Sequence, residues 1–228
     1  MSRRISEDYK VFSAFLKEYD LCSYEQQQTD VYKTMHKKLY GLLIFVSEYT
    51  TQNSLSKNES FLKEMSSDLL LSLFCAVQGL YKPAKLQLRC SIENFFKALI
   101  MLETPLIIEE KSVYVVFDTA KIDKHFNSPL GTKYMTRLQN DYSTLCRTVH
   151  GDPSVMHPIS ALSLFPQYDL ASLRELSTLY IRTIEADLGI FYLNYPSVID
   201  KMHPENKKDF LDCISKSAKG EIIKALFG

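Results

Sequence analysis

The chain has 228 residues, 46% of them hydrophobic and 24% charged, values that are typical of a globular protein and exclude general disorder. Its 27 basic and 27 acidic residues give a formal net charge of zero, which excludes a global attraction to nucleic acid or to anionic membranes. Only 7 glycines and 8 prolines are present, which favours long helices over many short strands and turns.

The N-terminal quarter of the chain predicts two helices and a polar loop. Residues 5–19 carry apolar side chains at helical spacing and predict an amphipathic helix. After a break at 20–23, the apolar stripe of residues 24–48 predicts a long helix. Residues 50–60 are polar and predict a loop, in which Asn58 or Ser60 is available as the N-cap of the next helix.

The next two segments predict a pair of apolar helices at the centre of the fold. Residues 61–79 form a strongly apolar pattern that Gly79 can end, and residues 83–103 form a second helix that stops before Pro105. The connection between them is short, so we expect an antiparallel pair. The run from Leu69 to Tyr81 is shorter than the roughly 18–20 residues of a spanning helix, and we expect it to be buried, with no membrane association.

The second half of the chain predicts further helices around two less regular segments. Residues 112–117, SVYVVF, have strand-like propensity but no pairing partner, so we expect residues 104–130 to form a loop with short helical turns. Residues 134–150 predict a helix, followed by a loop at 151–169 that contains three prolines. A loop of that length inside a domain is more often functional than a short one.

A long helix at 170–195 and an amphipathic C-terminal segment complete the pattern. The predicted fold class is all-α: a bundle of four to five core helices within residues 1–200, with a helical C-terminal extension at 201–228. No apolar run follows the N-terminal residues MSRRISEDYK, so we expect no signal peptide.

The cysteine and histidine patterns bear on location and on metals. The five cysteines are widely spaced and contain no CxxC pair, which favours reduced, packed cysteines in a cytoplasmic protein. The histidines lack metal-ligand spacing, and the common nucleotide-phosphate and serine-hydrolase motifs are absent. We therefore expect neither a metal nor a cofactor.

Three charged residues share one face of the 83–103 helix. Arg89, Glu93 and Lys97 are spaced at i, i+4 and i+8 among apolar neighbours. Buried charges need partners, so the pattern allows either a structural ion pair between Arg89 and Glu93 or a polar functional cluster. The order Arg before Glu is the less favourable one for a simple helix pair.

His150 and the preceding turn are the second candidate site. His150 precedes Gly151 at the predicted end of a helix, where the helix dipole raises the pKa of an imidazole. A histidine in that position can act as a general acid–base or can cap the helix. Arg147 on the same helix, and Lys97 on the earlier one, are candidate phosphate-binding residues.

The segments LRCSIENFFKALIML (88–102) and YSTLCRTVHGD (142–152) resemble bacterial helical domains of the HEPN type, in a subgroup with an Arg-x3-Glu helix and a Tyr-x2-Leu-Cys-x3-His segment. The resemblance implies a helical bundle that is often a homodimer. It also implies a place in antiviral defence or toxin–antitoxin systems, where many HEPN proteins are metal-independent ribonucleases. Those enzymes use an Arg and a His spaced R-x4-6-H, and this sequence departs from that spacing.

Two functional hypotheses follow. In the first, the chain is a ribonuclease effector in which His150 is the general acid–base, Arg89 stabilises the phosphate and Glu93 orients them. In the second, it is a non-catalytic helical interaction or regulatory module within a larger complex. The expected partners are RNA or a nucleotide in the first case, and a second copy or another protein in either.

Overall fold

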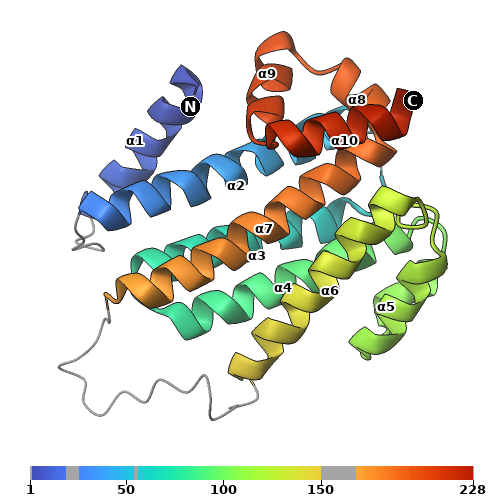
Figure 1. The fold of residues 1–228 in the computed structure, drawn as a ribbon, viewed down its shortest axis with the longest axis horizontal. Helices are drawn as coiled ribbons and strands as arrows, with labels where there is room; N and C mark the ends of the chain where they lie inside the picture. The colour runs from blue at the N-terminus through green and yellow to red at the C-terminus, as the bar shows by residue number, and fades with distance from the viewer. Residues whose placement is uncertain (1, 19–25, 54–55, 150–167, 228) are drawn as a thin grey trace.

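The structure, a computed structural model, describes residues 2–18, 26–53, 56–149 and 168–227. Every regular element in these residues is a helix (Figure 1), which confirms the predicted all-α class. The elements in chain order are α1 (Arg3–Glu18), α2 (Gln26–Gln52), α3 (Glu59–Val77), α4 (Tyr81–Ile100), the 3-10 helix η1 (Pro105–Glu109), α5 (Val113–Ile122), α6 (Pro129–Val149), α7 (Leu170–Asn194), α8 (Pro196–Asp200), α9 (Pro204–Asp212) and α10 (Lys216–Phe227).

Helices α3 and α4 form the predicted antiparallel pair, and Gly79 makes the turn between them. Gly79 adopts a φ of 68°, a conformation that favours glycine. The amide of Leu80 donates to the Cys75 carbonyl at 2.8 Å, and the amide of Gly79 donates to the Ala76 carbonyl at 3.1 Å. This pair of bonds is the Schellman motif, which satisfies carbonyls that the end of α3 would leave unpaired.

The core lies where α2, α4 and α7 meet. Phe45 of α2 stacks on Phe191 of α7 with ring centres 4.1 Å apart, and Phe95 of α4 meets the same ring edge-on at 5.3 Å. Asp169 fixes the start of α7, because its carboxylate accepts from the amides of Ala171 and Ser172. Helix α6 packs along α4 and α7 on the side away from α1 (Figure 1).

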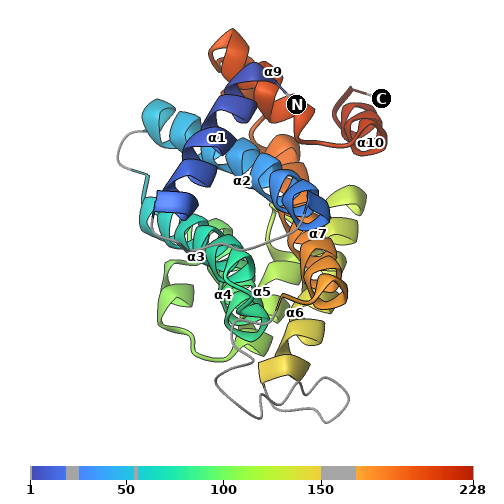
Figure 2. The ribbon, with the colours of Figure 1, turned by 90° about the vertical axis from the view of Figure 1, so that its left-hand side faces the viewer.

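Helix α1 packs on α2 (Figure 2) and contributes side chains of one face to the hydrophobic core. Ile5, Tyr9 and Leu16 bury one face of the amphipathic helix that the sequence predicts. Arg4 ties its N-terminal turn to α9, donating to the Asn206 side-chain oxygen at 2.8 Å. Helix α1 makes more contacts with α2 than with α3.

The prediction for residues 104–130 is wrong in part, because residues 113–122 form a continuous helix, α5. Val116, Phe117 and Ala120 are buried on one face of α5, which packs against α4. This tertiary burial outweighs the weak helix propensity of the β-branched residues. Tyr114 and Val115 remain exposed on the other face.

The segment predicted as a C-terminal extension contains α9 and α10, and both pack on the bundle. Helix α9 contacts α2, and α10 contacts α7 and α6. Lys38 of α2 joins these parts, since its ammonium group lies 2.6 Å from Glu185 and 2.7 Å from the Cys213 carbonyl. Among the described helices, none has both the length and the hydropathy needed to cross a membrane.

Candidate functional site

Arg89 lies between α4 and α6, where α6 supplies its partners. Its Nη2 donates to the Tyr142 hydroxyl at 2.7 Å and its Nε donates to Cys146 Sγ at 3.4 Å. The guanidinium carbon also lies 4.9 Å from the centre of the Tyr142 ring, within the range of a cation–π interaction. The fold therefore engages two of the five N–H donors of Arg89 and holds its guanidinium against α6.

The pKa values in this cluster reflect burial and mutual hydrogen bonding. Burial raises the pKa of the Tyr142 hydroxyl above its ordinary range, and the Arg89 charge only partly opposes that change. Burial would lower the pKa of Arg89, but hydrogen bonds and charges from Cys146 and Tyr142 outweigh that effect and raise it. At neutral pH the pair is a cation and a neutral phenol, a stable arrangement with no proton ready for transfer.

Glu93 forms its ion pair with Lys97 instead of with Arg89. Glu93 Oε1 lies 3.4 Å from Lys97 Nζ, and Lys97 Nζ also donates to the Glu110 carbonyl at 2.8 Å. Glu before Lys at i, i+4 is the favourable order on a helix. The predicted ion pair between Arg89 and Glu93 is therefore wrong, because Glu93 pairs with Lys97. Lys97 in turn donates to the backbone carbonyl of Glu110, just after η1.

The remaining predicted site residues lie at or beyond the end of α6. Arg147 is exposed on its last turn. His150 and residues 151–167 of the predicted loop lie outside the described residues. The roles predicted for His150, Arg147 and Lys97 stay predictions.

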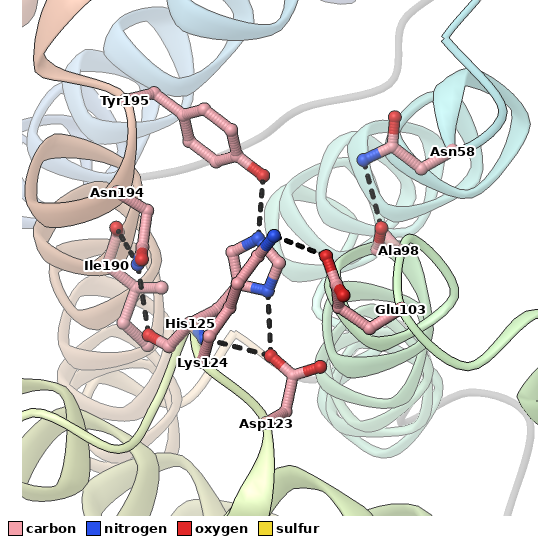
Figure 3. A network of polar contacts seen from close by, with 9 residues as sticks. All are labelled: Asn58, Ala98, Glu103, Asp123, Lys124, His125, Ile190, Asn194 and Tyr195. Atoms are coloured by element: carbon pink, nitrogen blue, oxygen red, sulfur yellow. Dashed lines mark hydrogen bonds and ion pairs between the residues drawn. The ribbon is translucent and has the colours of Figure 1, made fainter.

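A buried polar network joins the α5–α6 junction to the end of α7 (Figure 3). Asp123 Oδ1 accepts from the backbone amide of His125 at 2.9 Å and lies 2.7 Å from its Nδ1. A carboxylate only accepts hydrogen bonds, so Nδ1 donates to Asp123, and Nε2 is hydrogen-bonded with the Tyr195 hydroxyl at 3.2 Å. Asn194 completes the network by donating to the His125 carbonyl at 3.0 Å.

This arrangement orients a histidine as catalytic triads do, but its burial favours a structural role. The side chains of Asp123 and His125 are 3% and 4% exposed. Both ring nitrogens of His125 already have hydrogen-bond partners within the protein. The sequence pattern Asp-x-His at a helix junction is the signal that could have indicated this network.

An apolar groove runs between α1 and α3 above α2, with a volume of about 550 Å³. We call it the α1–α3 groove. In Figure 2, α1 lies above α3 with α2 running beside both. Its surface is almost entirely apolar, and its lining residues are Asp8, Val11, Phe12 and Phe15 of α1, His36, Leu39, Tyr40 and Leu43 of α2, and Leu70, Leu71 and Phe74 of α3.

Large apolar side chains of the groove are open to solvent. Leu70 and Leu71 are 47% and 43% exposed, Phe15 is 45% exposed and Val11 is 70% exposed. Contiguous exposed apolar surface on a folded protein often marks a binding site. A volume of about 550 Å³ is also within the usual range for a ligand pocket, roughly 300–1,000 Å³.

The prediction that the most apolar helix is buried is wrong in part, because α3 exposes Leu70 and Leu71 in the groove. Leu69, Leu70 and Leu71 are consecutive, and successive residues turn by about 100° on a helix. Three consecutive leucines therefore cannot all share one buried face. Leu69 enters the core, and the two that follow line the groove. This triplet is the sequence signal that could have indicated the groove.

No metal site is found among the described residues, in which no group of three or more His, Cys, Asp or Glu side chains has suitable geometry. Comparisons of the chain with protein-family models, with curated proteins and with solved structures found no significant match. The HEPN resemblance therefore rests on the two sequence motifs alone.

Proposed function

We propose that this protein is a non-catalytic helical binding module whose binding surface is the α1–α3 groove. The observation that carries the proposal is the row of exposed apolar side chains along one groove of about 550 Å³. Following the HEPN resemblance, we place the module in a bacterial defence or toxin–antitoxin type system.

The contacts of the polar candidates support the same choice. Arg89 is engaged by Tyr142 and Cys146, and Lys97 is engaged by Glu110 and Glu93. A phosphate at either cation would have to compete with contacts that hold α4 to its neighbours. The groove offers apolar surface at no such cost, because its side chains already face solvent.

Binding of the neutral apolar dye Nile red tests the proposed surface. Its fluorescence should rise with the wild type and should fall to background with Leu71→Glu, which places a charge in the groove. Ile108→Glu is the matched control, since Ile108 is 45% exposed but does not line the groove. Equal fluorescence with both variants, each shown to be helical by circular dichroism, would overturn the proposal.

A ribonuclease is the second candidate, and one contact favours it. Arg89 binds Tyr142 and Cys146, residues that precede His150 along the chain at successive steps of four. Four-residue steps repeat one face of a helix. This spacing supports the assignment of His150 as general acid–base and of Arg89 as the phosphate-stabilising cation.

Cleavage of mixed RNA in the absence of metal separates the two candidates. A ribonuclease should lose activity in both His150→Ala and Arg89→Ala, whereas Arg3→Ala, on α1, should retain it. A binding module should show no cleavage that depends on either residue. Activity that survives both substitutions would exclude this assignment of the catalytic residues.

A further inference from the structure

Asp8 brings an acidic group to the edge of the α1–α3 groove. Its side chain is 50% exposed, and its Oδ2 lies 2.9 Å from Nε2 of the buried His36. Burial lowers the pKa of His36 and outweighs the opposing effect of Asp8. The imidazole is therefore neutral near pH 7, so it donates a hydrogen bond to Asp8 without neutralising the charge of the carboxylate.

Charges of both signs lie around the Tyr40 end of the groove. Burial raises the pKa of the Tyr40 hydroxyl; of the charges, Arg4 has the largest effect and lowers this pKa, whereas the carboxylates of Asp8 and Asp209 raise it. The Arg4 guanidinium reaches Glu205 at 3.5 Å and Asp209 at 3.7 Å. The Arg4 guanidinium thus faces two carboxylates, and neither it nor they line the groove. Asp8 is the carboxylate that does line it, which favours a cation over an anion at this end.

We propose that the α1–α3 groove binds a small apolar molecule that carries one cationic amine, with the amine beside Asp8 and Tyr40 and the apolar body along Leu70, Leu71 and Phe74. This inference rests on the proposed function and specifies its ligand class.

The dimensions and chemistry of the groove fit such a ligand. A volume of about 550 Å³ suits one small molecule. The ammonium group can bond the exposed part of the Asp8 carboxylate and lie near the aromatic rings of Phe12 and Tyr40, both of which line the groove. A carboxylate on the same apolar body would meet the Asp8 charge and be repelled.

Three probe molecules with one aromatic body test the charge preference. They are 2-naphthylmethylamine, a cation at pH 7; 2-naphthalenemethanol, its neutral analogue; and the anion 2-naphthoate. Titration calorimetry at low salt should show the amine binding roughly three-fold to ten-fold more tightly than the alcohol, and 2-naphthoate binding most weakly.

Two substitutions assign the preference to the groove. Asp8→Asn keeps an oxygen that accepts from His36 but removes the charge, so the amine and the alcohol should bind equally and the alcohol should bind as it does to the wild type. Leu71→Glu should weaken binding of the alcohol at least ten-fold, and Ile108→Glu should leave all three affinities unchanged.

The outcomes separate this inference from the proposed function. Equal binding of the amine and the alcohol to the wild type would overturn the proposal that the ligand is a cation. Loss of Nile red binding in Leu71→Glu would in that case still support the groove as a binding site. A leucine–lysine amphipathic peptide that binds the groove, with no preference for the small amine, would overturn the small-molecule class in favour of a helical partner.

Discussion

The guanidinium of Arg89 donates to the hydroxyl of Tyr142 at 2.7 Å and lies over the same ring. One side chain of α6 thus provides both a hydrogen-bond acceptor and an aromatic face to a cation of α4. The contact joins the two sequence motifs on which the family resemblance rests. Arg89 was a predicted site residue, whereas Tyr142, its hydrogen-bond partner, was not.

Tyr142→Phe should separate the two parts of this contact. The substitution keeps the aromatic face and removes the oxygen, so we expect a loss of about 1–2 kcal/mol in the free energy of unfolding. Chemical denaturation measures this loss. Tyr114→Phe is the matched control, because Tyr114 is 79% exposed, and it should change stability by less than about 0.5 kcal/mol. Equal effects of the two substitutions would show that the hydroxyl contact contributes nothing.

The Asp123–His125 contact should contribute more to stability than the neighbouring surface ion pair. Asp123→Ala removes the acceptor for two donors of His125 inside the protein, and we expect a loss of roughly 2–4 kcal/mol because the donors stay buried and unpaired. Lys124→Ala breaks only the exposed pair with Glu103 and should cost less than about 1 kcal/mol. Similar losses in thermal or chemical unfolding would contradict the structural role of the network.

The helix pairing could be predicted from the sequence because local signals determine it. Gly79 supplies the left-handed turn that ends α3, and Asp169 caps α7. Both act through backbone groups within a few residues. The failure at α5 has the opposite cause. Its β-branched residues carry no strong helix signal, and burial of Phe117 against α4, a contact distant in sequence, decides the structure.

The candidate sites were less accessible to sequence reasoning. The spacing of Arg89, Glu93 and Lys97 correctly places them on one face of α4, but the partner of each depends on neighbouring elements. Tyr142 competes for Arg89, and the Glu110 carbonyl competes for Lys97. Predicting the groove requires knowing that α1 packs mainly on α2, which no periodicity within α1 reveals.

Gly41 should be intolerant of a side chain, unlike Gly220. A Cβ at Gly41 would lie 2.6 Å from both Cβ and Sγ of Cys213, whereas a Cβ at Gly220 has nothing within 4 Å. We expect Gly41→Ala to cost about 1–3 kcal/mol through overpacking. Gly220→Ala, inside helix α10, should stabilise by roughly 0.5–1 kcal/mol. Thermal unfolding of the two variants checks both signs, and a stabilising Gly41→Ala would contradict the packing of α2 against Cys213.

Asp68 predicts a specific dependence of stability on pH. Burial raises its pKa from 3.8 to about 6, although Asn94 donates a hydrogen bond to it at 2.8 Å; the charges of Glu64 and Glu93 raise the pKa further. The unfolded carboxyl loses its proton near pH 4 and the folded one near pH 6. The folded state is thus favoured below that interval, and stability falls as the pH rises through it.

Asp68→Asn should remove this part of the pH dependence. An amide oxygen can still accept from Asn94, and the neutral group carries no penalty for ionising inside the protein. We expect the variant to match the wild type at pH 4 and to exceed its stability at pH 7 by on the order of 1–2 kcal/mol, allowing for partial solvation. Denaturant unfolding at both pH values measures the difference. For Glu64→Gln, at an exposed position of α3, the change in the free energy of unfolding should differ much less between the two pH values. If the stability gained by Asp68→Asn did not grow from pH 4 to pH 7, burial of the ionised carboxylate would not be its cause.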